Sequence, residues 1–181
     1  MADVGCGLGA STRLLRTRGV AAVGVDVDME ARAGAFPFVA ADAARLPVAN
    51  GSLDGVLAEC VLSTLSDRGA ALAEWRRVLR PGGRLALSDV TSRSAEAELI
   101  ATADALTWAI AAAGFVVERF EDRSQALKRW VAEFIFAHGS LDALCGGLGG
   151  IDGATLRLSR PGYGLVVARK PGDRSEEAAH V

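Results

Sequence analysis

DVGCGLGAST, the stretch from Asp3 to Thr12, decides the fold of this 181-residue chain. Glycine occupies every second position from Gly5 to Gly9, after an acidic residue and before a Ser-Thr pair. Because glycine has no Cβ and tolerates positive φ, such a turn lets the backbone approach a ligand closely. The stretch therefore predicts a ligand-binding turn between a strand and the N-terminus of a helix.

The composition indicates one globular domain with a small partner. The chain has 181 residues and a mass of 18.7 kDa, enough to bury a single core. Half of the residues are hydrophobic and the net charge is -2, which argues against disorder and against a broad basic surface for nucleic acid. No apolar run reaches the roughly 18 residues of a membrane span. We expect a small-molecule partner, no nucleic acid and no membrane, and the oligomeric state stays open.

The cysteines and lysines bear on the cellular setting. Cys6, Cys60 and Cys145 are odd in number, far apart and without a CxxC pair. They indicate neither a disulfide framework nor a zinc ribbon, so no metal site is predicted and a reducing cytoplasm fits best. Lys128 and Lys170 are the only lysines, and alanine is abundant, which is typical of a GC-rich bacterial gene.

Short β-branched runs alternate with longer Ala/Leu/Arg segments, the pattern of a parallel sheet covered by helices. The predicted strands are Ala2–Val4, Ala21–Asp26, Phe36–Ala40, Leu53–Glu59, Arg84–Asp89, Phe115–Glu121 and Tyr163–Arg169. The predicted helices are one that Ser11 or Thr12 caps and that ends before Gly19, then about Arg68 to Leu79, Ala95 to Ala113 and Ser124 to His138.

We expect residues 1–170 to form one domain, with two departures from a uniform pattern. Residues 124–160 combine an amphipathic helix with a glycine-rich run, an inserted unit that could act as a substrate lid. Only two residues precede Asp3, so the first strand is expected to be truncated. Residues 171–181 are expected to be a disordered tail.

Two ligand classes use a glycine turn of this kind. Gly5 to Ala10 satisfies GxGxxA, a form of the dinucleotide-binding turn. Asp3, two residues before the first glycine, and the alternating rhythm give D-x-G-x-G-x-G and favour the second class. An NAD-dependent oxidoreductase is further disfavoured because no Tyr-Lys or Ser pair is evident and Tyr163 is the only tyrosine.

The D-x-G-x-G-x-G stretch resembles the first motif of the class I S-adenosylmethionine-dependent methyltransferases. Further stretches follow in that family's order along nearly the whole chain: VAAVGVDVD ending near Asp26, FVAADAARLPVANGSLDGVL around Asp42, LRPGGRLALSDV from Leu79 and GYGLVVARK from Gly162. The resemblance implies an α/β, Rossmann-like doubly wound sheet, mostly parallel, with an antiparallel last strand and the order 3-2-1-4-5-7-6.

The resemblance also implies S-adenosylmethionine as the cofactor. The positions that match the family's cofactor-binding residues are Asp3, Gly5, Gly7, Gly9, Asp26 and Asp42. Asp26 would accept hydrogen bonds from both ribose hydroxyls, as a carboxylate can, and Asp42 would contact the adenine amino group. Asp28 could compete with Asp26, and either acid could instead be an ordinary strand-end or turn residue.

Methyl transfer needs alignment and a dry pocket, and a base only when the acceptor must lose a proton. Glu59 and Asp89, at the ends of predicted strands, are the candidate catalytic carboxylates, although a solvent-facing acid is the alternative for Glu59. His138 precedes Gly139 and is expected to cap its helix.

The stretch around Cys60 resembles the arsenite methyltransferase branch, in which thiolates hold the metalloid. That resemblance makes Cys60 and Cys145 candidate substrate ligands. For a small-molecule methyltransferase in general, we expect the helix around Trp130 to form a wall of the substrate pocket. We expect a methyltransferase that acts on a small molecule. The alternatives are an arsenite methyltransferase-like enzyme and a non-catalytic or N-terminally truncated S-adenosylmethionine-binding protein.

Overall fold

The computed structural model describes residues 1–28, 36–93, 101–139 and 160–172. The predicted glycine-rich run, with Cys145, and most of the predicted tail lie outside the described residues.

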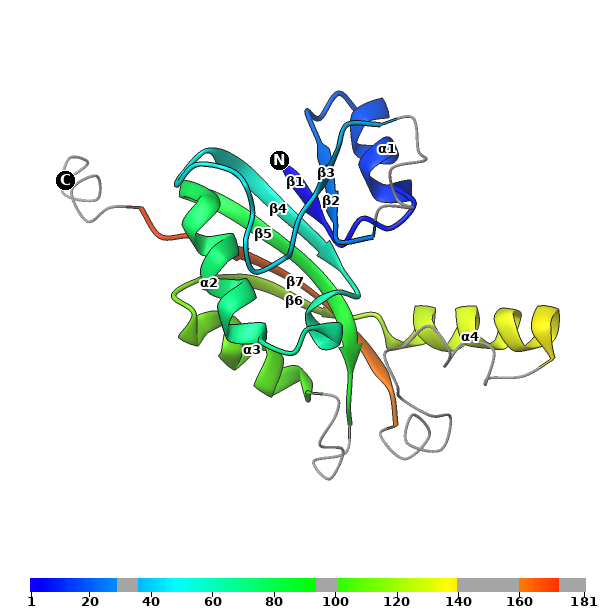
Figure 1. The fold of residues 1–181 in the computed structure, drawn as a ribbon. Helices are drawn as coiled ribbons and strands as arrows, with labels where there is room; N and C mark the ends of the chain where they lie inside the picture. Colours follow the sequence, from blue (N-terminus) through cyan, green and yellow to red (C-terminus); the bar gives the residue numbers. More distant parts are fainter. Residues whose placement is uncertain (29–35, 94–100, 140–159, 173–181) are drawn as a thin grey trace.

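A seven-stranded sheet of order β3-β2-β1-β4-β5-β7-β6 forms the centre of the fold (Figure 1). Its strands are β1 (Ala2–Val4), β2 (Val23–Asp26), β3 (Phe38–Ala40), β4 (Leu53–Glu59), β5 (Leu79–Thr91), β6 (Val116–Asp122) and β7 (Gly162–Arg169). All neighbouring pairs are parallel except those of β7, which is antiparallel to β5 and to β6. The predicted order and the antiparallel last strand are confirmed.

The helices of the described residues are α1 (Ala10–Thr17), the short 3-10 helix η2 (Leu62–Thr64), α2 (Arg68–Val78), α3 (Ala103–Ala112) and α4 (Ser124–His138). In Figure 1, α1 lies beside β2 and β3, α2 and α3 run along the β4–β6 half of the sheet, and α4 extends away from it. No helix of the described residues is long and apolar enough to cross a membrane.

The core lies between the β4–β7 part of the sheet and α2 with α3. Its largest fully buried side chains include Trp75, Leu72, Leu85, Leu87, Ile110 and Val166. Trp75 is completely buried, and its indole N–H donates to the carbonyl of Ala43 at 3.0 Å. The core therefore also ties α2 to the segment that follows β3.

Strand β5 begins earlier than the sequence predicts, at Leu79 rather than Arg84. Leu79 pairs with Leu53, and the register then shifts before Gly55 pairs with Arg84. The intervening Arg-Pro-Gly-Gly therefore forms an irregularity within the strand rather than a separate turn before it.

The predicted cap of α1 is wrong. Gly9 occupies the N-cap position with φ 75°, and no side chain caps the helix. The two hydroxyls instead reach across to the sheet: Ser11 donates to Glu59, and Thr12 donates to Asp3 at 2.5 Å between Oγ1 and Oδ2. Thr12 and Asp3 are both buried, so this bond joins the interior of α1 to β1.

Helix α4 has the predicted bounds, and α3 begins later than predicted. The hydroxyl of Thr102 accepts from the Ala105 N–H at 3.1 Å and caps α3, while residues 94–100 lie outside the described part of the chain. Gly139 ends α4 in the left-handed conformation, and the ring of His138 packs 4.4 Å from that of Phe134. This placement agrees with the expected position of His138 at the helix C-terminus.

The Thr12–Asp3 bond yields the first testable prediction. Thr12→Val keeps the shape of the side chain but removes the side-chain donor of a buried carboxylate, so we expect a loss of about 1–3 kcal/mol in the free energy of unfolding at pH 7. Urea denaturation measures it. Thr17→Val is the control, because Thr17 is exposed and bonds only within its own helix, to Leu14; its effect should stay within about 0.5 kcal/mol.

The same pair predicts the pH dependence of that loss. Burial raises the pKa of Asp3 above its ordinary 3.8, and the Thr12 hydroxyl opposes the rise. A raised pKa in the folded state means that stability is lost as pH rises from 3.8 through the folded value. Thr12→Val raises the folded pKa further, so its destabilisation should grow between pH 3 and pH 7. A constant difference would contradict an ionised Asp3 in the folded protein.

Candidate functional site

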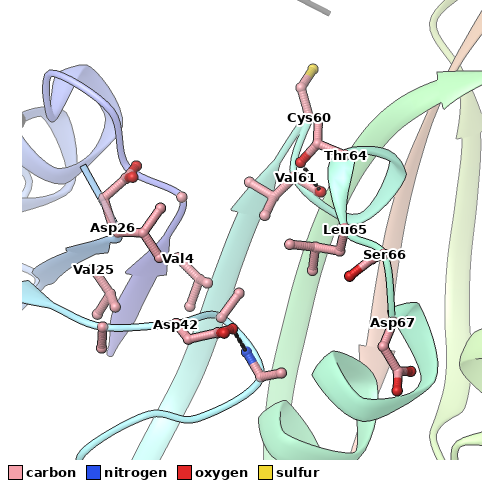
Figure 2. A pocket seen from close by; sticks show the side chains of 15 residues that line it. Val4, Val25, Asp26, Asp42, Cys60, Val61, Thr64, Leu65, Ser66 and Asp67 are labelled. Atoms are coloured by element: carbon pink, nitrogen blue, oxygen red, sulfur yellow. Dashed lines mark hydrogen bonds between the residues drawn. The ribbon is translucent and has the colours of Figure 1, made fainter. Parts of the chain in front are cut away.

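A cavity of about 420 Å³ lies at the carboxyl ends of β1 to β4 (Figure 2). Its lining residues are Val4, Gly5, Val25, Asp26, Val27, Ala41, Asp42, Ala43, Ala44, Cys60, Val61, Thr64, Leu65, Ser66 and Asp67. This volume falls in the range of about 300–1,000 Å³ that small-molecule sites occupy. The edge of the sheet is also the expected one, since ligands of open α/β sheets bind at the carboxyl ends of the strands.

The glycine turn forms the β1 side of the cavity. The N–H groups of Gly5 and Cys6 both donate to the Val25 carbonyl, at 2.7 and 3.1 Å, which folds the turn over the end of β2. Gly5 has φ 67°, and a Cβ there would lie 2.2 Å from Cγ2 of Val61. Only glycine therefore fits where the turn approaches the segment after β4.

Asp26, at the end of β2, lines the cavity and is held by backbone donors. One oxygen accepts from the N–H of Gly7 at 2.8 Å, and the other accepts from the N–H of Asp28 at 3.0 Å. A carboxylate has roughly four acceptor positions, so Asp26 retains capacity for two hydroxyl donors. Asp28 is not among the lining residues, which favours Asp26 over its neighbour.

Asp42 lines the same cavity from the segment after β3. Its Oδ1 accepts from the N–H of Ala44 at 2.8 Å, and its carbonyl accepts from the N–H of Arg45 at 2.9 Å. Figure 2 shows Asp26 on one side of the cavity and Leu65, Ser66 and Asp67 across it. The two predicted carboxylates therefore meet at one cavity, as the order of strands requires.

The other predicted cofactor residues lie next to the cavity rather than on its wall. Asp3 is buried below the turn, where it accepts from Thr12. Gly7 has φ 49°, and nothing lies within 4 Å of the position of its missing Cβ. Gly9 caps α1. The turn thus leaves open space at Gly7 and a helix N-terminus behind it, a suitable environment for a polar ligand group.

Cys60 lies at the rim of the cavity, with an unusual backbone and a neutral thiol. Its φ is 55°, and Figure 2 shows its thiol directed away from the cavity. The sulfur lies 3.6 Å from the Tyr163 hydroxyl, which donates to the Ser88 hydroxyl at 2.8 Å. Burial raises the pKa of the Cys60 thiol, although the residue as a whole is exposed. Cys60 is therefore a thiol rather than a thiolate near pH 7.

The second free cysteine in the described residues has similar chemistry. Burial raises the pKa of Cys6 to about 11, and the negative charges of Asp3 and Asp26 add to the rise. Among the residues that the structure describes, no group of three or more His, Cys, Asp or Glu side chains could hold a metal ion. Cys145 lies outside the described residues, so its distance from Cys60 is not defined.

Of the predicted catalytic and substrate residues in the described part of the chain, Glu59, Asp89 and Trp130 do not line this cavity, whereas Cys60 does. Glu59 is exposed at the end of β4, where it accepts from Ser11. Asp89 is 2% exposed and accepts from the N–H and hydroxyl of Ser63 and from the N–H of Val90, at 2.6–2.8 Å. Trp130 is 48% exposed on α4.

One wall of the cavity is absent from the sequence predictions. Thr64 reaches it from η2, and Leu65, Ser66 and Asp67 reach it from the segment between η2 and α2. The side chain of Asp67 accepts from the N–H of Ala70 at 2.8 Å and caps α2. The Ser-Asp pair before a helix was a visible capping signal, but nothing in the sequence indicates that this cap faces a cavity.

Residues 2–87 match a family model described as a methyltransferase domain. An O-methyltransferase of Pyrenophora dematioidea is 37% identical over 101 residues, which cover 49% of this chain and 38% of that protein. A demethylmenaquinone methyltransferase of Beutenbergia cavernae is 38% identical over 96 residues, 50% of this chain and 40% of that protein. The matched stretch thus covers about two fifths of each of these relatives.

Solved structures agree over most of the described fold. The [4+2]-cyclase SpnF has a TM-score of 0.75 and 27% identity, over 95% of this chain and 74% of that one. A geranyl diphosphate methyltransferase in complex with S-adenosylmethionine has a TM-score of 0.79 at 16% identity, over 93% of this chain and 77% of that one, a likeness of fold alone. Residues 2–87 thus match a methyltransferase domain, and the fold of the chain is similar to that of solved methyltransferases.

Proposed function

We propose that this protein binds S-adenosylmethionine in the 420 Å³ cavity and methylates a small molecule. The observation that supports it best is the meeting of Gly5, Asp26 and Asp42 on one wall, each from the end of a different strand. S-adenosylmethionine is the cofactor of the methyltransferase family whose model residues 2–87 match. The open glycine turn suits the amino-acid end of the cofactor, and the carboxylates of Asp26 and Asp42 suit its ribose and its adenine.

The residues would divide the cofactor between them. The backbone of the Gly5–Gly9 turn would contact the amino-acid end, Asp26 would accept from the ribose hydroxyls, and Asp42 would accept from the adenine amino group. When bound, the cofactor supplies a methyl group on a positively charged sulfur. Asp26, Asp42 and Asp67 give the cavity a negative lining, which favours a cationic ligand over its neutral product.

The apolar lining would contribute to the rate of methyl transfer. Val4, Val25, Val61 and Leu65 line the cavity and exclude water from the bound ligand. A hydroxyl acceptor would also need a base, and Glu59 is the candidate, because it lies at the exit of β4. For Asp89 we favour a positioning role, since its two donors from Ser63 hold η2 against β5.

The relatives support an oxygen acceptor, because some of them are named O-methyltransferases. A malonyl-[acyl-carrier protein] O-methyltransferase of Pseudescherichia vulneris, 32% identical over 98 residues (51% of this chain, 39% of that protein), adds a carboxylic acid to the candidate acceptors. No observation on the described residues favours the arsenite alternative: the thiol of Cys60 is directed away from the cavity, and no group of three or more His, Cys, Asp or Glu side chains there could hold a metal ion. The composition supports a bacterial, cytoplasmic setting without nucleic-acid or membrane partners.

One comparison supports a second candidate. SpnF, with 27% identity over 95% of this chain, is named a cyclase rather than a methyltransferase. A protein of this fold that binds S-adenosylmethionine without transferring its methyl group is therefore the alternative, and binding and transfer need separate measurements.

Cofactor binding tests the site. Asp26→Ala should weaken the binding of S-adenosylhomocysteine by about 1–3 kcal/mol, or about 5- to 150-fold in Kd, because it removes the charged acceptor for the ribose. Calorimetry measures the effect. Asp54→Ala is the control, since Asp54 lies exposed at the start of β4 and pairs with Arg80. Unchanged affinity in Asp26→Ala, or a wild-type protein that binds NAD but not S-adenosylmethionine, would refute the proposal.

Methyl transfer tests the reaction. S-adenosylhomocysteine released from S-adenosylmethionine should appear with at least one of a set of small phenols, carboxylic acids and amines. If the acceptor is a hydroxyl, Glu59→Gln should lower kcat by about 10²- to 10⁴-fold without changing cofactor affinity, because only the proton transfer is affected. Tight cofactor binding with no turnover of any class would favour the cyclase-like alternative.

A further inference from the structure

Arg77 of α2 uses all of its hydrogen-bonding capacity on one loop and one neighbour. A guanidinium has five N–H donors. In Arg77, Nη1 donates to the Val48 carbonyl at 3.0 Å and to Oδ1 of Asn50 at 2.6 Å, and Nη2 donates to the Leu46 carbonyl at 3.1 Å. The remaining two donors bind the carboxylate of Glu74 at 2.6 and 2.7 Å.

Glu74 completes the attachment of the loop. Its Oε1 also accepts from the N–H of Leu46 at 2.6 Å, so the Glu74–Arg77 pair binds both backbone polar groups of Leu46. The hydrogen bond from Arg77 holds the pKa of Glu74 below its ordinary range and that of Arg77 above it. Leu46 itself is 4% exposed, so its side chain anchors the same point in the core.

This loop carries the β3 wall of the cavity. Asp42 precedes Leu46 by four residues, and the Arg45 N–H donates to the Asp42 carbonyl at 2.9 Å. Ala43, between them, is held by the Trp75 indole. Neither Glu74 nor Arg77 lines the cavity. Their contacts can therefore affect the position of Asp42 only through the loop.

We propose that Glu74 and Arg77 are positioning residues that set the preference of the cofactor site for adenine, through Leu46 and Asp42. The inference rests on the proposed cofactor site and goes beyond it. Lysine cannot replace Arg77, because a single ammonium has three donors and no planar fork to bind Glu74, Leu46, Val48 and Asn50 together. Loosening the loop displaces the acceptor for the adenine amino group while leaving the ribose acceptor, Asp26, on β2.

The test measures base preference as well as affinity. We compare the Kd of S-adenosylhomocysteine with that of S-inosylhomocysteine, in which a carbonyl replaces the amino group of the base. The wild-type protein should prefer the adenine form, and Arg77→Lys should reduce the ratio of the two Kd values about tenfold, the loss of one good hydrogen bond. Asp42→Ala should reduce the ratio at least as much.

Arg76→Lys is the matched control. Arg76 neighbours Arg77 on the same helix but donates to the Gly114 carbonyl, at 3.3 Å, on the side of β6. Both substitutions can lower the melting temperature, whereas only Arg77→Lys should change the ratio. Glu74→Gln provides a second variant with the same expected change if Arg77→Lys does not fold.

The outcomes separate the two proposals. An unchanged ratio in a folded Arg77→Lys or Glu74→Gln protein would overturn the positioning role while leaving the cofactor site intact. A wild-type protein that binds S-adenosylhomocysteine without preferring adenine would also overturn it. A wild-type protein that binds neither ligand would refute the cofactor site, and the positioning role with it.

Discussion

Parallel pairing of β1 with β2 on one side and β4 on the other is the constraint on which the rest of the structure depends. Val4 stands opposite Val25 and opposite Ala58, so the three strands end at the same level. The residues that follow them, a glycine turn, Asp26 and the segment after Glu59, therefore open onto one edge of the sheet. The buried Thr12–Asp3 bond then fixes α1 directly behind that edge.

Much of this arrangement could be predicted from the sequence, because it depends on periodicity and strand order. The bounds of β4 and α4 agree with the prediction, and the order of motifs placed Asp26 and Asp42 at neighbouring strand ends. The partners of Ser11 and Thr12 could not be predicted, since a hydroxyl near a helix start looks like a cap in one dimension. Their acceptors come from strands that only the folded sheet brings near.

The roles of the acidic residues around the site are even harder to predict from the sequence. Asp26, Asp42, Glu59 and Asp89 stand at or just after the ends of strands as the sequence predicts them, although β5 in fact continues to Thr91, and the sequence cannot tell which of these acids face a ligand. Asp26 and Asp42 do so, because backbone donors orient them while leaving acceptor capacity. Asp89 is surrounded by donors from η2, and Glu59 is bound by α1. These donors belong to segments whose path is set by packing rather than by local pattern.

The position of β7 has a consequence for how the protein is made. This strand is the last of the described strands in sequence, yet it lies between β5 and β6, and β6 pairs with no other strand in the described residues. On the ribosome, Val116–Asp122 must wait for Gly162–Arg169 before it has a sheet partner, whereas β1 to β4 can pair as soon as they emerge. The ligand-facing half of a nascent chain can thus assemble while its far edge is still unfinished.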